Sequence, residues 1–304
     1  MELYLPVANM SVHILWILAL GTMVGLLSGM FGVGGGFLTT PLLIFSGIPP
    51  TVAAASAATQ VTGASVSGMM AYLRRGGVDL HMGAVLVAGG LIGSILGAFA
   101  FRWLESIGQI DTVIALLYLL LLGSIGGLML KESLTTLNIL RSGAQPVTRK
   151  RRHHPLVTML PLRWRFYRSG LYISPIAPLI LGAISGMMTM LLGVGGGFIM
   201  VPAMLYILGM GAEVVVGTSL FQIFLTTIAT TLIHSVTTHA VDIVLALLLL
   251  IGGVIGAQIG ARLAMRANPA RLRLILAIIV LLVALRMGAG LTWRPDEIFT
   301  VQAL

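Results

Sequence analysis

The chain has 304 residues, of which 58% are hydrophobic and 9% are charged, and its mean hydropathy is +1.04. A soluble domain is about 45–50% apolar and about 25% charged, so the composition excludes an ordinary soluble protein. The absence of cysteine excludes disulfides and cysteine-based metal sites. Most of the formal charge of +9 lies in short segments between apolar runs, where the positive-inside rule places it, and does not argue for a nucleic-acid partner.

Ten apolar segments predict an all-α, polytopic membrane protein. They lie near residues 12–31, 35–48, 51–73, 80–102, 110–130, 172–192, 196–209, 213–234, 241–262 and 271–290. No Lys or Arg precedes the first segment, so we expect a retained helix there rather than a cleaved signal. The second and seventh have about 14 residues each and reach roughly 21 Å, against ~30 Å for the hydrocarbon core. Each is either a short spanning helix or a re-entrant one.

A glycine block interrupts the apolar pattern twice. Residues 32–36 read Gly-Val-Gly-Gly-Gly and are followed by Phe37, and residues 193–197 repeat this pattern before Phe198. Each glycine inside a helix costs about 1 kcal/mol relative to alanine. The two blocks therefore predict two helices that are broken at membrane depth.

The two blocks belong to an internal duplication. An offset of 161 residues joins Gly25 to Gly186 and carries through both blocks, and it drifts by only two further on. The downstream pairs are Ser56 with Thr218, Gln60 with Gln222, Asp79 with Asp242, and Gly89, Gly93 and Gly97 with Gly252, Gly256 and Gly260. The sequence therefore predicts two five-helix repeats.

The basic residues predict the orientation of these repeats. They gather in the segment 132–171, after the third apolar segment at Arg74, and within residues 262–273. If all ten segments span, the three clusters lie on one side, the cytoplasm. The predicted parts are then a first membrane repeat at 1–131, a basic cytoplasmic loop, and a second repeat at 172–304. The repeats are inverted, and both termini lie outside.

The glycine blocks are candidate anion sites. Inverted repeats with broken helices are typical of secondary transporters, whose substrate binds at the repeat interface. Unwound backbone exposes N–H groups, and a helix that starts there directs its positive end at the membrane centre. The candidate residues are Gly34, Gly35, Gly36, Gly195, Gly196 and Gly197. Close helix packing alone is the alternative interpretation.

Hydroxyl and amide side chains form a second candidate group. They are Ser56, Thr59, Gln60, Thr218, Ser219 and Gln222. Ser56 and Gln60 are four residues apart and so share a helix face, as do Thr218 and Gln222. Matched glutamines favour ligand binding, because an amide offers both donors and acceptors. Hydrogen bonding between helices is the alternative.

Few titratable residues lie near the apolar segments. Asp79 and Asp242 open the fourth and ninth segments, where a carboxylate favours a helix start. These two residues and His234 are candidates for proton coupling, against a structural role for each. No metal-binding cluster and no nucleophile–base pair is found, so we expect no cofactor and no enzyme. The spaced glycines at 89–97 and 252–260 predict close helix contact, within one protomer or across a homodimer.

These residues resemble a known family. Two copies of Gly-x-Gly-Gly-Gly-Phe followed by proline, each with a Ser/Thr-rich and then a Gly-rich helix, look like the sulfite exporter TauE/SafE family of anion permeases. The resemblance covers nearly the whole chain outside 131–171. It implies transport of small sulfur-containing anions such as sulfite, thiosulfate or organosulfonates. It also implies that the glycine blocks and the Ser56/Gln60 and Thr218/Gln222 positions line the path.

The sequence therefore predicts an inner-membrane secondary transporter for a small anion. Its partners are the anion and the lipid bilayer. A channel-like conduit for water or neutral solutes is the alternative, because an uncharged polar path suits such solutes nearly as well. A cation carrier is disfavoured, since matched carboxylates are missing from the segment centres.

Overall fold

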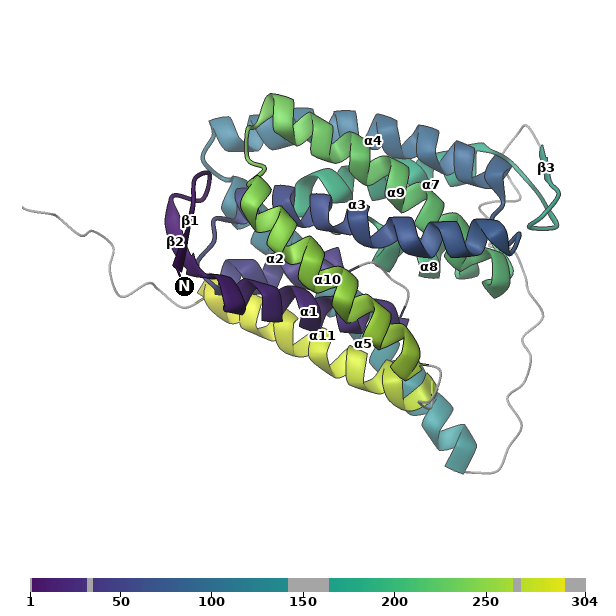
Figure 1. Cartoon of the computed structure of the whole chain (residues 1–304). Helices are drawn as coiled ribbons and strands as arrows, with labels where there is room; N and C mark the ends of the chain where they lie inside the picture. Colours follow the sequence, from purple (N-terminus) through teal and green to yellow (C-terminus); the bar gives the residue numbers. More distant parts are fainter. Residues whose placement is uncertain (1, 32–34, 142–163, 265–268, 293–304) are drawn as a thin grey trace, which may run out of the picture.

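A computed structural model describes residues 2–31, 35–141, 164–264 and 269–292. These residues form ten helices and two β-hairpins (Figure 1). In the first half they are β1 (Glu2–Leu5), β2 (Met10–His13), α1 (Ile14–Phe31), α2 (Gly36–Phe45), α3 (Pro50–Arg74), α4 (Leu80–Ser106) and α5 (Ile110–Arg141). In the second half they are β3 (Trp164–Phe166), β4 (Leu171–Ile173), α7 (Ile176–Leu192), α8 (Gly197–Tyr206), α9 (Ala212–Thr237), α10 (Ile243–Ala264) and α11 (Pro269–Thr292).

Each predicted apolar segment overlaps a helix, and the differences lie at the ends. α5 continues to Arg141, beyond the predicted end at residue 130, because helix-forming residues such as Lys131, Glu132 and Leu134 follow it directly. The predicted loop 132–171 thus begins inside α5 and ends inside the β3–β4 hairpin. Its residues 142–163 lie outside the described part of the chain.

Two short antiparallel hairpins correct the purely helical prediction. β1 pairs with β2 and β3 with β4, over only three or four residues per strand. Their turns contain Asn9 (φ 51°) and Gly170 (φ 64°), in the left-handed region that asparagine and glycine tolerate. These residues are also 161 positions apart, so the offset reaches the hairpins as well. Strands this short carry almost no periodic signal, which is why they were not predicted.

The helices of one half pack mainly on those of the other half. The most extensive contacts join α1 to α10, α4 to α7, α5 to α11, and α3 to α9 (Figure 1). By the repeat offset, α1 corresponds to α7 and α10 to α4, so the first two pairs are equivalent. The fold therefore depends on contact between the two halves.

Equivalent helices run in opposite directions where they meet. In both the α3–α9 and the α5–α11 pair, rising residue numbers on one helix meet falling numbers on the other. The contacting pairs are Thr59 with Thr231, Gly68 with Leu220, Leu119 with Gly288, and Gly126 with Leu281. α3 corresponds to α9 and α5 to α11, so these two pairs of equivalent helices pack antiparallel.

The predicted close contact of the glycine faces is confirmed, and the structure places it between helix backbones of one protomer. A Cβ on Gly93 of α4 would lie 1.9 Å from the Ala183 carbonyl oxygen of α7. At the equivalent pair, a Cβ on Gly256 of α10 would lie 2.0 Å from the Thr22 carbonyl oxygen of α1. Only glycine permits this approach, so the spaced glycines serve packing between the repeats.

Among the residues that the structure describes, five helices are long and apolar enough to cross a membrane. They are Leu80–Ser106, Ile110–Thr135, Val214–Thr237, Ile243–Gly260 and Leu274–Leu291. They carry outward rows of exposed apolar side chains, as on α4, where Leu91, Ile95 and Phe99 are exposed. Such rows suit a lipid environment, and the chain is a multi-pass helical membrane protein. α2 and α8 have ten residues each, or roughly 15 Å at 1.5 Å per residue.

Candidate functional site

The described end of the first glycine block, Gly35 and Gly36, lies close to the second block. The rings of Phe37 and Phe198, equivalent residues of the two halves, stack with centroids 4.4 Å apart and an interplanar angle of 3°. A Cβ on Gly36 would lie 2.5 Å from the carbonyl oxygen of Gly193. The structure therefore brings together the two breaks. The predicted site residue Gly34 lies outside the described residues.

Both short helices start at these breaks without a side-chain cap. α2 follows Gly35 and α8 follows Gly196, and neither N-cap position makes a side-chain hydrogen bond. Gly193, Gly195 and Gly196 have φ near +70°, a left-handed conformation that favours glycine. The first N–H groups of a helix have no intrahelical acceptor, so two positive helix ends lie close together here.

Gln60 of α3 lies beside the first break with its amide oxygen occupied. Thr39 of α2 donates its hydroxyl to Gln60 Oε1 at 2.8 Å. On the amide's other side lies Gly253 of α10, where a Cβ would be 2.9 Å from Gln60 Nε2. Gln60 is buried, and a small residue opposite it gives the amide its space.

Gln222 of α9 occupies the matching place beside the second break. Its Nε2 donates to Thr226 Oγ1 at 3.1 Å and to Ser185 Oγ of α7 at 3.4 Å. Gly90 of α4 lies opposite, where a Cβ would be 3.4 Å from Nε2. Gln222 is fully buried, and its Oε1 is the buried side-chain polar atom without a partner in the described part of the chain. The two glutamines thus share a position but differ in hydrogen bonding.

Ser56 and Thr218 bind the aspartates of the opposite half. Ser56 Oγ accepts the backbone N–H of Asp242 at 3.3 Å, and Thr218 Oγ1 accepts that of Asp79 at 3.0 Å. Each hydroxyl lies one helical turn before its glutamine on the same face. These contacts link the start of α4 to α9 and the start of α10 to α3.

The two aspartates cap helices and hold the hairpins. Asp79 accepts Met82 N at 3.1 Å as the N-cap of α4, and it also accepts Ser169 N at 2.9 Å and Ser169 Oγ at 2.6 Å. Asp242 accepts Leu245 N at 3.1 Å and Val7 N at 3.1 Å. Each hairpin is therefore attached to a helix start of the other half.

The remaining predicted residues bond mainly within helices. Thr59 donates to the Ala55 carbonyl at 3.3 Å and faces Thr231 at 3.4 Å, and Ser219 donates to the carbonyl three residues before it. His234 Nε2 lies 2.9 Å from the Met190 carbonyl oxygen near the end of α7, and Nδ1 lies 3.1 Å from Thr238 Oγ1. The structure thus places His234 as a contact between α9 and α7.

Sequence reasoning missed several polar residues around the breaks. Thr39 and Thr40 follow the first block, and Thr40 donates to the Leu192 carbonyl at 3.0 Å, just before the second block. Ser185 and Thr189 precede the second block and are both fully buried. Ser185 and Thr189 are four residues apart, share a helix face and lead into a glycine break, and this spacing was the signal available in the sequence.

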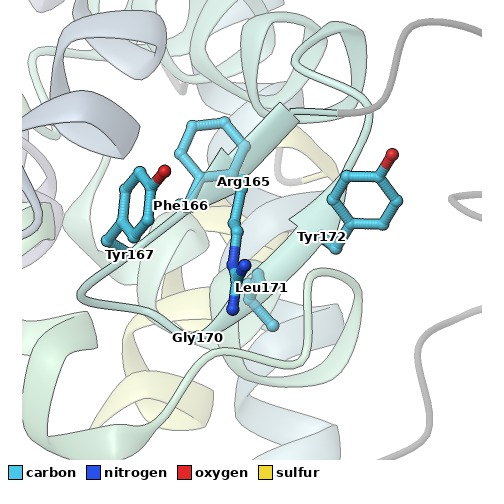
Figure 2. A pocket seen from close by; sticks show the side chains of 6 residues that line it. All are labelled: Arg165, Phe166, Tyr167, Gly170, Leu171 and Tyr172. Carbon is cyan, nitrogen blue, oxygen red and sulfur yellow. The ribbon is translucent and has the colours of Figure 1, made fainter.

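A surface hollow of about 450 Å³ lies away from the breaks, at the β3–β4 hairpin. Figure 2 shows its lining side chains, which include Arg165, Tyr167 and Tyr172. The Arg165 guanidinium lies 5.7 Å from the centre of the Tyr167 ring, a cation–π distance. Exposed tyrosine and arginine at the end of a helical bundle are typical of a membrane–water interface.

Polar groups thus converge on two buried helix starts in an apolar bundle. The profile of the family described as Sulfite exporter TauE/SafE matches residues 17–287. The chain belongs to this family. The family comprises membrane transporters, and its sulfite exporter name agrees with the resemblance in the glycine blocks and their downstream helices. Membership in a transporter family also argues against an enzyme.

Individual relatives agree with this assignment. The chain is 28% identical over 274 residues to the "Probable membrane transporter protein YjnA" of Bacillus subtilis, covering 89% of this chain and 98% of the relative. It is 27% identical over 271 residues to a "Probable membrane transporter protein" of Xylella fastidiosa, covering 87% and 91%. The "Sulfite exporter TauE/SafE family protein 5" of Arabidopsis thaliana is 43% identical over 58 residues, which cover 19% of this chain and 13% of the relative. No solved structure matches the chain.

Proposed function

We propose that this TauE/SafE family member is a secondary transporter for a small sulfur-containing anion such as sulfite, thiosulfate or an organosulfonate. The single observation that carries the proposal is the meeting of two uncapped helix starts, that of α2 beside Gln60 and that of α8 beside Ser185, which bonds to Gln222. Backbone N–H groups at such ends favour an anion. The amides and neighbouring hydroxyls supply further neutral donors. Ser56 and Thr218, on the same helix faces as the two glutamines, bond to the opposite half and so fix the helices that carry these glutamines.

The architecture we propose is a pair of inverted five-helix repeats with ten membrane crossings. Antiparallel contact of equivalent helices supports it, because an odd number of crossings per half reverses every helix relative to its equivalent. If α2 and α8 did not cross, each half would contain four crossings, and α5 would run parallel to α11. The contacts of Gly126 with Leu281 and of Leu119 with Gly288 are instead those of two antiparallel helices.

The sidedness we propose follows from the charges. Arg74 and Arg75 at the end of α3 are exposed, and they share a side with the 132–171 segment in the ten-crossing arrangement. The positive-inside rule makes that side the cytoplasm of a bacterial-type inner membrane, with both termini outside. The spaced glycines already pack within the chain, so they provide no contact for a homodimer.

Alternating access gives the anion its route in this proposal. Gln222, Ser185 and Thr226 are fully buried, so the polar groups are closed from both surfaces in this conformation. Movement of one repeat against the other would open them to one side at a time. A closed site disfavours the channel-like conduit, which needs a continuous path. Proton coupling through Asp79, Asp242 or His234 stays a prediction.

The test is anion flux into proteoliposomes containing the full chain. Gln60→Ala combined with Gln222→Ala should abolish sulfite or sulfonate flux while the protein still elutes as a folded species. Gln258→Ala is the matched control, because Gln258 is an exposed amide on α10 and its loss should leave flux unchanged. Full flux in the double variant would refute the site. Flux that neither saturates nor responds to an opposing gradient would favour a conduit.

A further inference from the structure

The two halves differ at one pair of equivalent positions beside the glutamines. Thr39 N and Met200 N each bond to the carbonyl of the glycine that precedes its helix, Gly35 at 3.3 Å and Gly196 at 2.8 Å. Thr39 and Met200 are therefore the same position of the repeat, 161 residues apart. Thr39 supplies a hydroxyl to Gln60, whereas a methionine thioether has no proton to donate.

This difference leaves one acceptor open. Gln60 Oε1 receives the Thr39 hydroxyl at 2.8 Å, but Gln222 Oε1 receives nothing from the described residues and is fully buried. A buried acceptor without a donor is costly, and native proteins seldom keep one without a use. The amide that carries Gln222 Oε1 belongs to the polar residues beside the second break. Its Nε2 donates to Ser185 Oγ, and Ser185 Oγ lies 1.9 Å from the place of a Cβ on Gly196.

The surroundings of this acceptor also limit the charge of a ligand. The side chains that converge here from three helices are neutral: Ser94 from α4, Ser185 and Thr189 from α7, and Gln222, Thr226 and Thr230 from α9. The sequences of α7 and α8 contain no charged residue. The cost of removing an ion from water rises with the square of its charge, so a neutral site accepts a monoanion far more readily than a dianion.

Resting on the proposed anion transport, we infer that the preferred substrate is a singly charged oxyanion that itself carries an O–H or N–H donor, and that this donor binds Gln222 Oε1. The anion's oxygens face the uncapped N–H groups at the start of α8, and its proton donor satisfies the amide oxygen. Hydrogen sulfite has this chemistry. Sulfate lacks it, because it is a dianion without a proton at neutral pH. The binding site is thus asymmetric and lies on the Gln222 side of the stacked phenylalanines.

Sulfamate and methanesulfonate provide a matched pair of probes. Both are monoanions across neutral pH with the same SO₃ group, and they differ by NH₂ in place of CH₃. Apparent Kd values come from thermal stabilisation of the purified full-length protein, with sulfite as the reference ligand. We expect sulfamate to bind about ten-fold more tightly, since methanesulfonate would leave the buried acceptor unpaired. Sulfate should bind more weakly than either.

Three variants assign this preference to one atom. Gln222→Leu removes the acceptor and should bring the two affinities together, whereas Gln60→Leu should weaken both probes alike and leave the ratio of their Kd values unchanged. Met200→Thr places a hydroxyl at the position of Thr39, where it satisfies Gln222 Oε1 from within, and should weaken the preference without deleting the amide.

The outcomes separate this inference from the transport proposal. Equal wild-type affinity for the two probes, or binding of neither in a protein that sulfite stabilises, overturns the inference alone. Preference for sulfamate that survives Gln222→Leu overturns the assignment to this amide. The wild-type comparison stands even if Gln222→Leu does not fold. Failure of every anion to bind or to cross the membrane overturns the proposed function, and the inference with it.

Discussion

Substitution of Gly93 by alanine tests the interlocked packing of the two halves. A Cβ at this position would lie 1.9 Å from the Ala183 carbonyl oxygen, about 1.4 Å less than the ~3.3 Å of an ordinary close carbon–oxygen contact. The Ala183 carbonyl carbon and Cα would also lie at 2.6 and 2.8 Å. These are backbone atoms, so no side-chain rotation relieves the clash, and α4 and α7 must separate.

The expected cost follows from two opposing terms. Overpacking of a close contact costs about 1–3 kcal/mol, and the higher helix propensity of alanine offsets about 1 kcal/mol of it. Because three backbone atoms clash, the upper end of the overpacking range applies, and we expect a net loss of about 2 kcal/mol, visible as a lower Tm of the detergent-solubilised protein. Gly123→Ala is the control, because nothing lies within 4 Å of a Cβ there and only the propensity gain remains. If Gly93→Ala were as stable as Gly123→Ala, the close α4–α7 approach would be refuted.

Two further predictions address the centre and the ends of the bundle. A double-mutant cycle with Phe37→Leu and Phe198→Leu should give a coupling energy of about 0.5–1.5 kcal/mol, because the rings stack at 4.4 Å; a coupling of zero in thermal or chemical unfolding would contradict the stack. Asp79→Ala should lower unfolding free energy by about 0.5–2 kcal/mol through loss of the α4 cap. Ser169→Ala, which removes one of the bonds to Asp79, should cost less and mainly speed proteolysis at the β3–β4 hairpin. Equal losses in Asp79→Ala and Ser169→Ala would argue against the cap.

Much of the candidate site follows from spacing alone. The offset of 161 residues pairs the two glycine blocks and the phenylalanines that follow them, and the rings of Phe37 and Phe198 stack in the structure. Gln60 and Gln222 were likewise predicted as a pair, and each lies opposite a glycine of the other half. Repetition makes such positions predictable, because a duplicated chain that packs on itself brings equal positions together.

The hydrogen-bond partners could not be predicted from repetition. Thr39 reaches Gln60 across 21 residues, and Ser185 reaches Gln222 across 37 residues. No local pattern marks either pair, because a side chain's partner depends on the rotation and depth of two packed helices. The hairpins were missed for a related reason, since strands of three or four residues are stabilised by contacts such as that of Ser169 with Asp79.

The sequence by itself determined that this is a polytopic helical membrane protein with two glycine-broken halves, because hydropathy, helix breakers and a constant offset are properties of the chain read in one dimension. The tertiary structure alone decided that the halves are unequal at their centre. Thr39 satisfies Gln60, whereas Gln222 Oε1 has no partner among the described residues, a difference visible only once α2 lies against α3 and α8 against α9. Hydrogen bonding depends on distance in space, and only packing of the helices sets that distance.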